Sequence, residues 1–439
     1  MIRLKRALHL RVYQNNRTVG YLAKEPSGAV TFQYDDEWLA NARAFPVSLS
    51  MPLREDVYRG EQVNAVFDNL LPDSESLRKQ IAERVSAGGT DALNLLTQIG
   101  HDCAGALRFL PADADPDAAS GSEGDPLDES DIEALINNLA HAPLGIRPED
   151  DFRISIAGAQ EKTALLHKEG KWYRPTGTMP TTHIIKTQIG TLPNGIDLKN
   201  SVENEHYCMT LAGLFGLPVP RTSVETFGRT KVLVIERFDR RWNKNGRLVR
   251  LPQEDCCQAL SVPPTQKYQS EGGPGIADIL ELLKAGDDPA RDQQTFLAAQ
   301  IFFWLIGATD GHAKNFSIFL KPGGAFEMTP LYDILTAQPF ADDNTITRRQ
   351  FRLAMSVGNN RHYRMDEISP RHYLQTASRA GVSEMILNAA MTQIATAGGR
   401  AFDHASRVLG DDFPAELHES VASAAKQRLP HVEQALGAA

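Results

Sequence analysis

Short alternations of apolar and polar positions open the chain. Apolar side chains recur at every second position over residues 8–12 and again over residues 30–34, a period that predicts β-strands. The pairs Asn15-Asn16 and Ser27-Gly28 lie between these runs and are typical of turns. We therefore expect a β-meander over residues 8–34.

A helical pattern follows this meander. After Pro72, either Asp73 or Ser74 can cap a helix that runs to about Val85, because a short side-chain oxygen accepts a hydrogen bond from the first helical turn. Residues 93–110 predict a further helix and a strand.

The composition changes over residues 111–130, which read PADADPDAASGSEGDPLDES. Large apolar side chains are nearly absent, so the segment cannot bury enough surface to offset the cost of ordering. We expect an acidic linker that is exposed or partly disordered.

Beyond residue 150 short apolar runs alternate with loops, and beyond residue 275 the pattern is mainly helical. Gly216 and Pro218 end a helix predicted at about 201–215, and a loop is expected around 322–350. Strands are predicted at Thr163–His167, Thr182–Thr187 and Lys231–Glu236, and Phe316–Leu320 interrupts the helical pattern.

These elements predict an α+β protein with a mixed α/β small lobe and a larger helical lobe. Kinases commonly bind nucleotide between two such lobes, although this is an analogy at the level of the fold. The expected domains are an N-terminal α/β subdomain (1–110), the acidic linker (111–130), an N-lobe with a phosphate-binding loop (131–250) and a helical C-lobe with a catalytic loop (251–439).

Charge and cysteine content limit the function classes. The formal net charge is −9, so the surface as a whole does not attract nucleic acid, although a local basic patch remains compatible. The four cysteines form no C-x-x-C pair and are expected to be reduced, mostly buried thiols. The most apolar run, 296–308, is shorter than the roughly 20 residues that span a bilayer. We expect a cytoplasmic protein without a membrane segment.

The strongest candidate for chemistry is Asp310-Gly-His-Ala-Lys-Asn315, followed by Asp333. Phosphoryl transfer depends on positioning and charge neutralisation. Asp310 can accept the proton of an acceptor hydroxyl, while Asn315 and Asp333 supply the oxygen ligands that Mg²⁺ prefers. The D-x-x-x-x-N spacing equals that of the protein-kinase catalytic loop. The alternative is a plain turn after an apolar helix.

Lys186 ends the apolar strand predicted at Thr182–Thr187. A kinase needs a strand lysine to hold the α- and β-phosphates, and Glu203 or Glu205 on the next predicted helix can orient it. An edge-strand lysine that points to water is the alternative.

Small residues precede Lys162 in the run Ser155-Ile-Ala-Gly-Ala-Gln-Glu-Lys162. Small side chains let backbone N–H groups approach phosphate oxygens, but the run lacks the spacing of a Walker A loop. A tight turn between strands stays open as an alternative.

Three other motifs are weaker. The linker backbone at Glu236-Arg-Phe-Asp239 can bind adenine, or it is a surface loop with solvated ion pairs. The run Glu271-Gly-Gly-Pro-Gly-Ile can bind an anion at a helix N-terminus, or it is a plain loop and helix start. His312 has no clustered His or Cys partners that would support a metal site.

Taken together, the motifs resemble the HipA family of bacterial toxin kinases and span nearly the whole chain in order. The matching runs are PVSLSMPL (46–53), FDNLLPDSE (67–75), FRISIAGAQEKTALL (152–166), PTTHIIK (180–186), ERFDRRW (236–242), LPQED (251–255), GGPGIA (272–277), LIGATDGHAKNFSIF (305–319) and MTPLYDI (328–334).

The resemblance implies a two-lobed kinase-like core of the lipid-kinase type with a smaller β-rich N-terminal subdomain, and ATP and Mg²⁺ as cofactors. It implies that Asp310 is the catalytic base and that Asn315 and Asp333 are the metal ligands. The implied nucleotide-binding residues are Ala157, Gly158, Ala159, Gln160, Lys162, Lys186, Glu236, Phe238, Gln253 and His312.

The resemblance also implies partners and regulation. Ser155 would be an inhibitory self-phosphorylation site. A helix-turn-helix antitoxin homodimer would bind the chain and carry most of the contacts to operator DNA. The protein substrate would be an aminoacyl-tRNA synthetase, with glutamyl-tRNA synthetase as the family's best-known target.

Two other functions stay open on the residues alone. A noncatalytic scaffold or corepressor in an antitoxin–operator complex would not need Asp310, Asn315, Asp333 or Lys186. A P-loop ATPase would need a Walker A spacing that the chain lacks.

Overall fold

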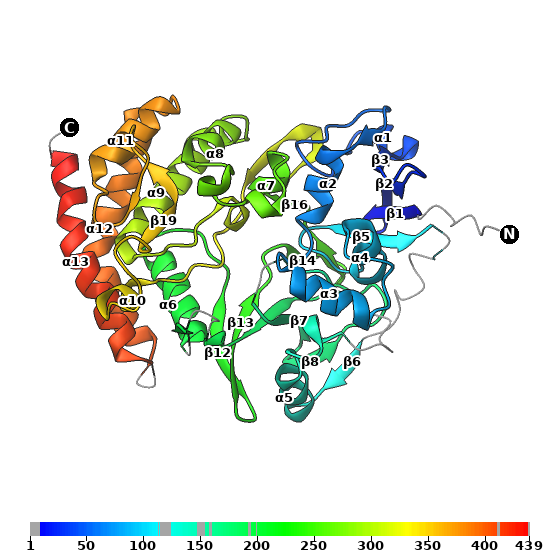
Figure 1. Cartoon of the computed structure of the whole chain (residues 1–439), viewed down its shortest axis with the longest axis horizontal. Coiled ribbons are helices and arrows are strands. Elements are labelled where there is room, and N and C mark those ends of the chain that lie inside the picture. The colour runs from blue at the N-terminus through cyan, green and yellow to red at the C-terminus, as the bar shows by residue number, and fades with distance from the viewer. Residues whose placement is uncertain are drawn as a thin grey trace. The chain divides into compact units, whose positions relative to one another are not determined.

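The computed structural model describes residues 9–112, 114, 124–146, 154–157, 160–191, 195–198, 200–410 and 413–437 (Figure 1). The chain divides into two compact units. Unit 1 comprises Met1–Thr187, Glu225–Thr265 and Phe319–Ala325, and unit 2 comprises Gln188–Val224, Gln266–Ile318 and Phe326–Ala439.

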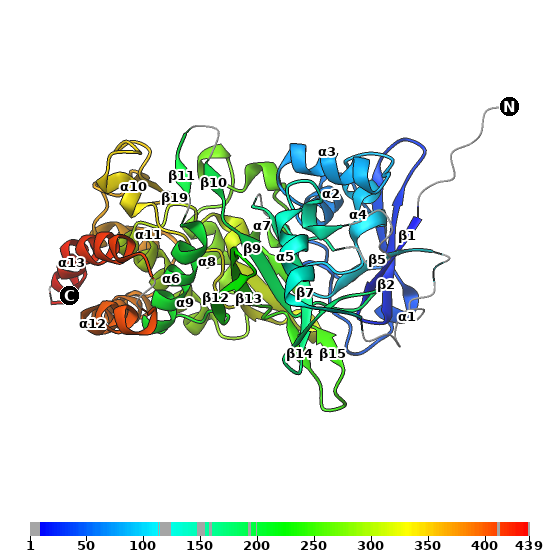
Figure 2. The ribbon, with the colours of Figure 1, turned by 90° about the horizontal axis from the view of Figure 1, so that it is seen from below.

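Unit 1 begins with a five-stranded sheet in the order β4-β3-β2-β1-β5, and all neighbouring strands are antiparallel. Figure 2 shows its strands β1, β2 and β5. The β-meander predicted for residues 8–34 is confirmed by its first three strands. The five strands are β1 (His9–Gln14), β2 (Arg17–Lys24), β3 (Val30–Tyr34), β4 (Tyr58–Arg59) and β5 (Leu107–Pro111).

Four helices accompany this sheet. Ser74 caps α3, since its hydroxyl accepts a hydrogen bond from the backbone N–H of Leu77, and Val85 is the C-cap. The predicted helix after Pro72 is thus confirmed, with Ser74 as the cap. The helices are α1 (Asp36–Leu39), α2 (Glu61–Asp68), α3 (Glu75–Arg84) and α4 (Ala92–Ile99).

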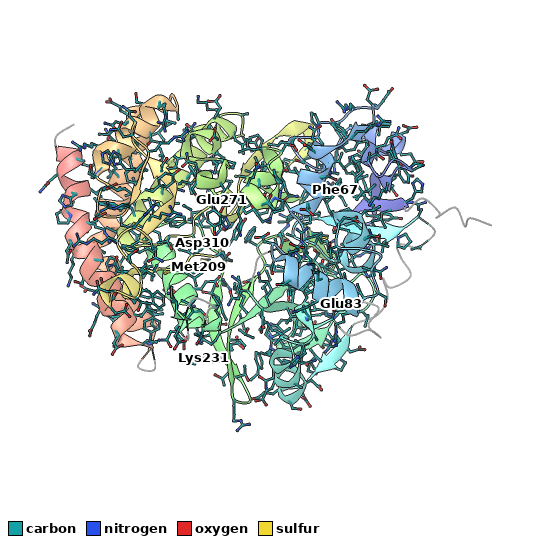
Figure 3. All side chains as sticks on the ribbon, in the orientation of Figure 1. Phe67, Glu83, Met209, Lys231, Glu271 and Asp310 are labelled. Atoms are coloured by element: carbon teal, nitrogen blue, oxygen red, sulfur yellow. The ribbon has the colours of Figure 1, made fainter. Side chains whose placement is uncertain are left out.

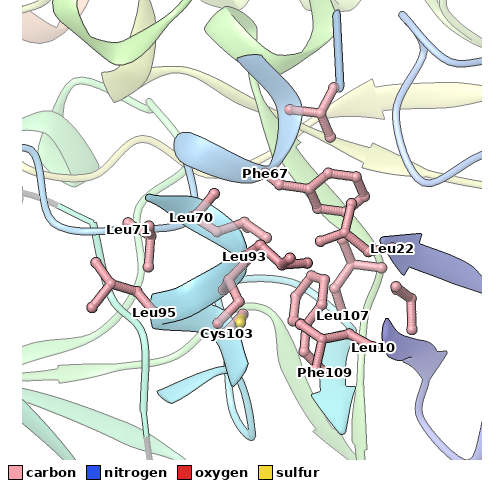
Figure 4. Packing of buried hydrophobic residues seen from close by; sticks show 14 of the residues in the cluster. Leu10, Leu22, Phe67, Leu70, Leu71, Leu93, Leu95, Cys103, Leu107 and Phe109 are labelled. Atoms are coloured by element: carbon pink, nitrogen blue, oxygen red, sulfur yellow. The ribbon is translucent and has the colours of Figure 1, made fainter. Parts of the chain in front are cut away.

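One apolar core joins this sheet to its helices. Phe67, Leu70, Leu93 and Phe109 lie in it with almost no exposed surface (Figure 4). Burying a side chain of this size stabilises the fold by about 1.5–3 kcal/mol. The same cluster contains Ile154 and Ile156, which flank Ser155 in the candidate phosphate-binding segment. That segment is therefore part of the N-terminal core.

A second sheet in unit 1 has the order β12-β13-β9-β7-β8-β6. It confirms the strands predicted at Thr163–His167, Thr182–Thr187 and Lys231–Glu236. The strands are β6 (Asp125–Leu127), β7 (Lys162–Lys168), β8 (Lys171–Arg174), β9 (His183–Thr187), β12 (Thr222–Phe227) and β13 (Thr230–Glu236).

The linker prediction was wrong for part of residues 111–130. Asp125–Leu127 forms the edge strand β6, which pairs antiparallel with β8, and the capped helix α5 (Glu129–Asn137) follows at once. An edge strand needs only backbone hydrogen bonds on one side, so a shortage of large apolar side chains does not prevent it. Residues 113 and 115–123 lie outside the described part of the chain.

The remaining elements of unit 1 are short. A hairpin of β14 (Arg240–Trp242) and β15 (Leu248–Arg250) pairs Arg240 with Arg250. It is followed by β16 (Gln253–Asp255) and α7 (Cys256–Ala259).

Unit 2 is mainly helical, as the pattern beyond residue 275 predicted. Its central helix α9 is buried along its C-terminal half, and α12 lies beside both α9 and α13 (Figure 1). The helices are α6 (Ser201–Leu214), α8 (Ile276–Leu283), α9 (Pro289–Ile306), α10 (Gln338–Asp342), α11 (Pro370–Arg379), α12 (Glu384–Val408) and α13 (Ala415–Gly437).

The strands outside the two larger sheets are short, and one of them, β17, contains a boundary between the units. The prediction of a loop around 322–350 was wrong in part, because a strand and α10 form within this region. These strands are β10 (Gly190–Thr191), β11 (Asp197–Leu198), β17 (Ser317–Leu320), β18 (Phe326–Met328), β19 (Arg352–Val357) and β20 (His362–Arg364).

The expectations for the cysteines and for membrane segments can be compared with the described residues. All four cysteines are buried, free thiols, as predicted. Within the described ranges, no helix combines the length and the apolar character needed to cross a membrane.

Candidate active site

The strongest candidate motif, Asp310-Gly-His-Ala-Lys-Asn315, follows helix α9 of unit 2. The helix ends at Gly307, which adopts a left-handed backbone conformation with φ of 71°. Gly311 then passes against the ring of Phe303, where a Cβ atom would lie 2.5 Å from ring carbons. The glycine in Asp310-Gly311 is therefore needed for close packing, and this packing places Asp310 at an exposed position directly after a buried helix.

Asn315 connects the two candidate acidic residues. Its amide nitrogen Nδ2 donates to the backbone oxygen of Asp310 at 3.2 Å and to that of Asp333 at 3.3 Å. Because the amide N–H groups of Asn315 donate to these two backbone oxygens, its amide oxygen Oδ1 is turned away from them. The structure thus brings together Asp310, Asn315 and Asp333, the three residues that sequence analysis singled out.

The backbone at Asp333 is unusual. Its φ is 59°, a left-handed conformation that Asp and Asn adopt more readily than most residues. The neighbouring Tyr332 connects this turn to the loop at 310–315, since its hydroxyl donates to the backbone oxygen of Lys314 at 2.7 Å and lies 2.6 Å from the Ser317 hydroxyl. The backbone at Asp333 is therefore held next to the side chain of Asn315.

The amide oxygen of Asn315 and the carboxylate of Asp333 form a donor set that fits Mg²⁺. Magnesium in nucleotide sites takes one or two protein oxygens and completes its shell with water and phosphate. Among the described residues, no group of three or more His, Cys, Asp or Glu side chains could hold a metal ion. The pair suits a metal that is bound together with phosphate.

Tyr268 also belongs to this site, and sequence analysis missed it. Its hydroxyl donates to Oδ1 of Asp310 at 2.5 Å, and its ring meets the buried His312 edge to face with centroids 4.8 Å apart. Figure 3 labels Asp310 among the side chains of unit 2. His312 thus supports Tyr268 and the loop.

In unit 1, the two candidate lysines face each other across neighbouring strands. Lys162 on β7 is in register with Lys186 on β9, and both side chains are buried. Two like charges directly opposite each other destabilise a sheet unless an anion compensates them. The Lys162 ammonium also donates to the backbone oxygen of Ala157 at 2.8 Å. This arrangement is suited to phosphate binding and excludes the water-facing alternative for Lys186.

Ser155 lies inside the N-terminal core. Its hydroxyl donates to the backbone oxygen of Leu70 at 2.7 Å, and its N–H donates to the backbone oxygen of Asp102 at 3.1 Å. The side chain has no exposed surface. A phosphate group cannot occupy this position, because it would be buried against a carbonyl oxygen.

The other predicted nucleotide residues of unit 1 differ in exposure, and two of them lie outside the described residues. Gln160 donates to the backbone oxygen of Thr187 at 2.6 Å, and Glu236 is exposed at the end of β13. Phe238 packs edge to face on Phe319. The side-chain oxygen of Gln253 is buried and accepts no hydrogen bond from the described residues. Gly158 and Ala159 lie outside the described residues.

On α6, both candidate carboxylates for orienting Lys186 are buried. Glu203 accepts a hydrogen bond from the Gln188 amide at 2.7 Å. Which of Glu203 and Glu205 pairs with Lys186 stays a prediction.

A buried charge cluster in unit 1 contradicts the view of Glu236-Arg-Phe-Asp239 as a surface loop with solvated ion pairs. Arg237 donates to Asp102 at 3.2 Å and to Asp239 at 2.7 Å. All three side chains are buried. Sequence analysis missed this because Asp102 lies 135 residues before Arg237.

Two further arginines complete the cluster. Arg240 donates to Asp102 at 2.9 Å and to Asp239 at 2.8 Å, and Arg250 donates to Asp102 at 2.7 Å. Burial alone would raise the pKa of Asp102, but attraction by the three guanidinium groups outweighs it and holds that pKa well below its usual range. Asp102 therefore stays ionised.

The run at 271–276 is a plain helix start. Gly275 is the N-cap of α8, and its N–H donates to the carboxylate of Asp278 at 2.8 Å. The chain's own carboxylate thus occupies the place that an anion would take.

The family follows from the extent of the sequence match. The model of the HipA-like C-terminal domain matches residues 154–401, and that of the HipA N-terminal domain matches residues 10–110. The chain belongs to the HipA family of serine/threonine kinase toxins. As a HipA-family member it is an enzyme of the protein kinase class.

Individual relatives support this family assignment. The chain is 34% identical over 406 residues, or 92% of each sequence, to the putative kinase Y4mE of Sinorhizobium fredii. It is 31% identical over 353 residues, or 77% of each, to the serine/threonine-protein kinase toxin HipA of Shewanella oneidensis. A solved complex of Shewanella oneidensis HipA with HipB and operator DNA contains a chain of the same fold, with a TM-score of 0.79, 24% identity and coverage of 98% of this chain and 99% of that chain.

Proposed function

We propose that this HipA-family chain transfers the γ-phosphate of ATP to seryl or threonyl hydroxyls of a translation-related protein. The observation that supports this best is the hydrogen-bonded arrangement of Asp310, Asn315 and Asp333 in unit 2. It joins an exposed carboxylate to two oxygen ligands of the kind that Mg²⁺ takes.

In this mechanism Asp310 accepts the proton of the acceptor hydroxyl. As the acceptor oxygen forms its bond to the γ-phosphorus, the bond from that phosphorus to the bridging oxygen breaks and ADP leaves. Asn315 and Asp333 would hold Mg²⁺, which neutralises phosphate charge when it is bound. Lys162 and Lys186, two buried cations in register, would bind phosphate oxygens.

The nucleotide base would be bound by residues of unit 1. The exposed Glu236, the ring of Phe238 and the unsatisfied side-chain oxygen of Gln253 are our candidates for contacts with adenine. A buried acceptor without a donor costs about 1–3 kcal/mol, and an adenine amino group would supply that donor to Gln253. In unit 2, His312 is also a candidate nucleotide contact.

Self-phosphorylation at Ser155 would switch the enzyme off. The buried Ser155 hydroxyl is inaccessible to any acceptor position while it donates to Leu70. Modification therefore requires the segment to leave the core. Once it carries about −1.5 to −2 charges, the serine cannot return, and the segment that includes Ala157 loses its position next to Lys162.

A helix-turn-helix antitoxin homodimer would neutralise the toxin and contribute most contacts to operator DNA. The solved Shewanella oneidensis structure contains HipA together with HipB and operator DNA. The net charge of −9 makes tight DNA binding by the isolated chain unfavourable. A noncatalytic corepressor role in such a complex is compatible with the kinase role.

The test is phosphotransfer by Asp310→Asn. Purified wild-type chain and variant are incubated with labelled ATP, Mg²⁺ and glutamyl-tRNA synthetase, and a cell extract serves as a second acceptor source. The exposed Asp366, paired with Arg364 at 2.7 Å, offers the matched control Asp366→Asn in the same unit. We expect labelling by the wild type and the control, and none by Asp310→Asn.

Each outcome decides one part of the proposal. Undiminished labelling by folded Asp310→Asn overturns the role of Asp310. Labelling of other extract proteins but not of the synthetase overturns only the choice of substrate. Antitoxin-dependent operator binding that persists in Asp310→Asn would show that the corepressor role is separate from catalysis.

A further inference from the structure

The hydroxyl of Tyr268 lies on the proposed catalytic carboxylate. The distance of 2.5 Å from this hydroxyl to Oδ1 of Asp310 is that of a charge-assisted hydrogen bond between a hydroxyl and an ionised carboxylate. A bond of this kind restricts the rotation of the carboxylate. Asp310 is an exposed residue, and this bond reduces the number of rotamers that its side chain can sample.

Tyr268 is itself held in place from two sides. Its ring packs edge to face on His312, whose N–H donates to the backbone oxygen of Asp310 at 2.8 Å. The ammonium group of Lys267 lies 5.5 Å from the centroid of the Tyr268 ring, and the backbone oxygen of Lys267 accepts from the N–H of Ala313 at 3.4 Å. The segment of Tyr268 and the loop of Asp310 therefore form one packed structure.

The glycine run after Tyr268 explains how this position is reached. The backbone oxygen of Tyr268 accepts hydrogen bonds from the N–H groups of Glu271 and Gly273, both at 3.0 Å. At Gly273 a Cβ atom would lie 1.9 Å from the backbone oxygen of Gln266, so only glycine fits. The side chain of Gln269 accepts from the N–H of Ser356 at 2.7 Å. The run thus forms a turn that fixes Tyr268.

We propose that Tyr268 is a positioning residue for Asp310, an inference that rests on the proposed kinase function. The phenol holds the carboxylate through Oδ1 in the orientation in which it accepts the proton of the acceptor hydroxyl. During transfer the proton of the acceptor passes to the Asp310 carboxylate, the new oxygen–phosphorus bond forms and the bond to ADP breaks. The Tyr268 proton stays on its own oxygen throughout.

Tyr268 could instead block the position of the acceptor, and this role predicts the opposite change in rate when its hydroxyl is removed. If the hydroxyl of Tyr268 occupied the place of the acceptor, it would act as an internal competitor that substrate must displace. Removing it would then increase the rate. The hydrogen-bonded turn that fixes Tyr268 favours the positioning role, because a group that substrate must displace would have to move away from Asp310.

The test compares Tyr268→Phe with a matched control. Tyr21 donates its hydroxyl to the carboxylate of Asp35 at 3.1 Å, an exposed Tyr–Asp pair in unit 1, so Tyr21→Phe removes the same kind of bond elsewhere. For Tyr268→Phe we expect kcat to fall by about tenfold to a hundredfold, a part of what a general base contributes. We expect KM for ATP to change by less than about twofold, because binding is not altered.

Two readouts separate positioning from a structural role. The loss in Tyr268→Phe should appear in kcat while KM for ATP stays within about twofold of the wild type, because the proposed role of Tyr268 is confined to the chemical step. A fluorotyrosine introduced at position 268 keeps both ring and donor and should restore kcat. Melting temperatures of all variants, measured by circular dichroism, show whether the phenylalanine variant is folded.

The outcomes are distinguishable from failure of the proposed function. A wild-type chain that labels no acceptor overturns the kinase proposal itself. If the wild type is active, Asp310→Asn is inactive and Tyr268→Phe keeps the wild-type kcat, only the role of Tyr268 is overturned. An increased kcat in Tyr268→Phe overturns positioning in favour of competition, and a loss that fluorotyrosine does not restore also overturns it.

Discussion

Neutralising Asp102 should destabilise unit 1 more than any surface charge change. In Asp102→Asn, the side chain keeps its volume, but three buried guanidinium groups lose this carboxylate. Arg237 and Arg240 keep their ion pairs with Asp239, whereas Arg250 loses its ion pair with Asp102. Removing one partner of a buried ion pair costs about 3–5 kcal/mol, because the other charge stays buried without compensation. At about 2–4 °C per kcal/mol for a unit of this size, the melting temperature should fall by about 6–20 °C.

Thermal unfolding followed by circular dichroism, with a urea titration in parallel, measures this difference. Asp366→Asn is the control, since it breaks an Asp–Arg pair of 2.7 Å whose side chains are about 40% exposed, and exposed pairs contribute about 0–1 kcal/mol. Because the pKa of Asp102 is held below its usual range, the contribution of this carboxylate is present above that range and is lost only as pH falls through the lowered pKa. The deficit of Asp102→Asn should therefore be undiminished at mildly acidic pH.

A second variant tests the physical reason for the loss. Replacing Arg250 by Gln in the Asp102→Asn background removes one of the uncompensated charges, and it should recover part of the lost stability through a coupling of about 1–3 kcal/mol. The reasoning is refuted if Asp102→Asn melts as the Asp366→Asn control does, or if the second substitution only adds to the loss.

Three further predictions concern other residues. Burial raises the pKa of Glu254 to about 8, so the folded chain binds more protons than the unfolded chain below that pH, and stability falls as pH rises toward it. Glu254→Gln should match the wild type near pH 5 and exceed it by about 3 kcal/mol near pH 8, and equal urea midpoints at both pH values would contradict this. Asp333→Ala should weaken Mg²⁺–ATP binding in calorimetry more than binding of metal-free ATP, and an equal loss would exclude action through the metal. Phosphoserine at position 155 should reduce ATP affinity at least tenfold, or about 1.4 kcal/mol, whereas Ser155→Ala should retain it, and equal affinities would refute the switch.

Local chemistry made much of the fold predictable. The period of two in residues 8–34, the Ser74 cap and the apolar run of α9 each depend on neighbours within a few positions, so they can be recognised in a single sequence. The 322–350 region was harder, because α10 is stabilised by distant residues such as Ser420, which donates to Asp342 at 2.6 Å.

Some residues of the candidate site can likewise be recognised from the local sequence, whereas others cannot. Asp310 and Asn315 are recognisable by their spacing, and the structure adds the hydrogen bonds that join them to Asp333. Tyr268 lies 42 residues before Asp310 and has no motif of its own that indicates chemistry. The glycine run that follows it was the available signal, but its purpose becomes visible only when the backbone contacts at Gly273 are known.

The charge cluster also bears on how the protein can be divided. Asp102 lies in the part that matches the HipA N-terminal domain, whereas Arg237, Arg240 and Arg250 lie in the part that matches the C-terminal domain. A fragment that starts after residue 110 would retain the three arginines and lose the carboxylate that all of them share, together with the apolar partners of Ile154 and Ile156. The two matched regions are therefore interdependent in folding, and an isolated C-terminal region should be insoluble unless the N-terminal region is supplied with it, for example by co-expression as a second chain.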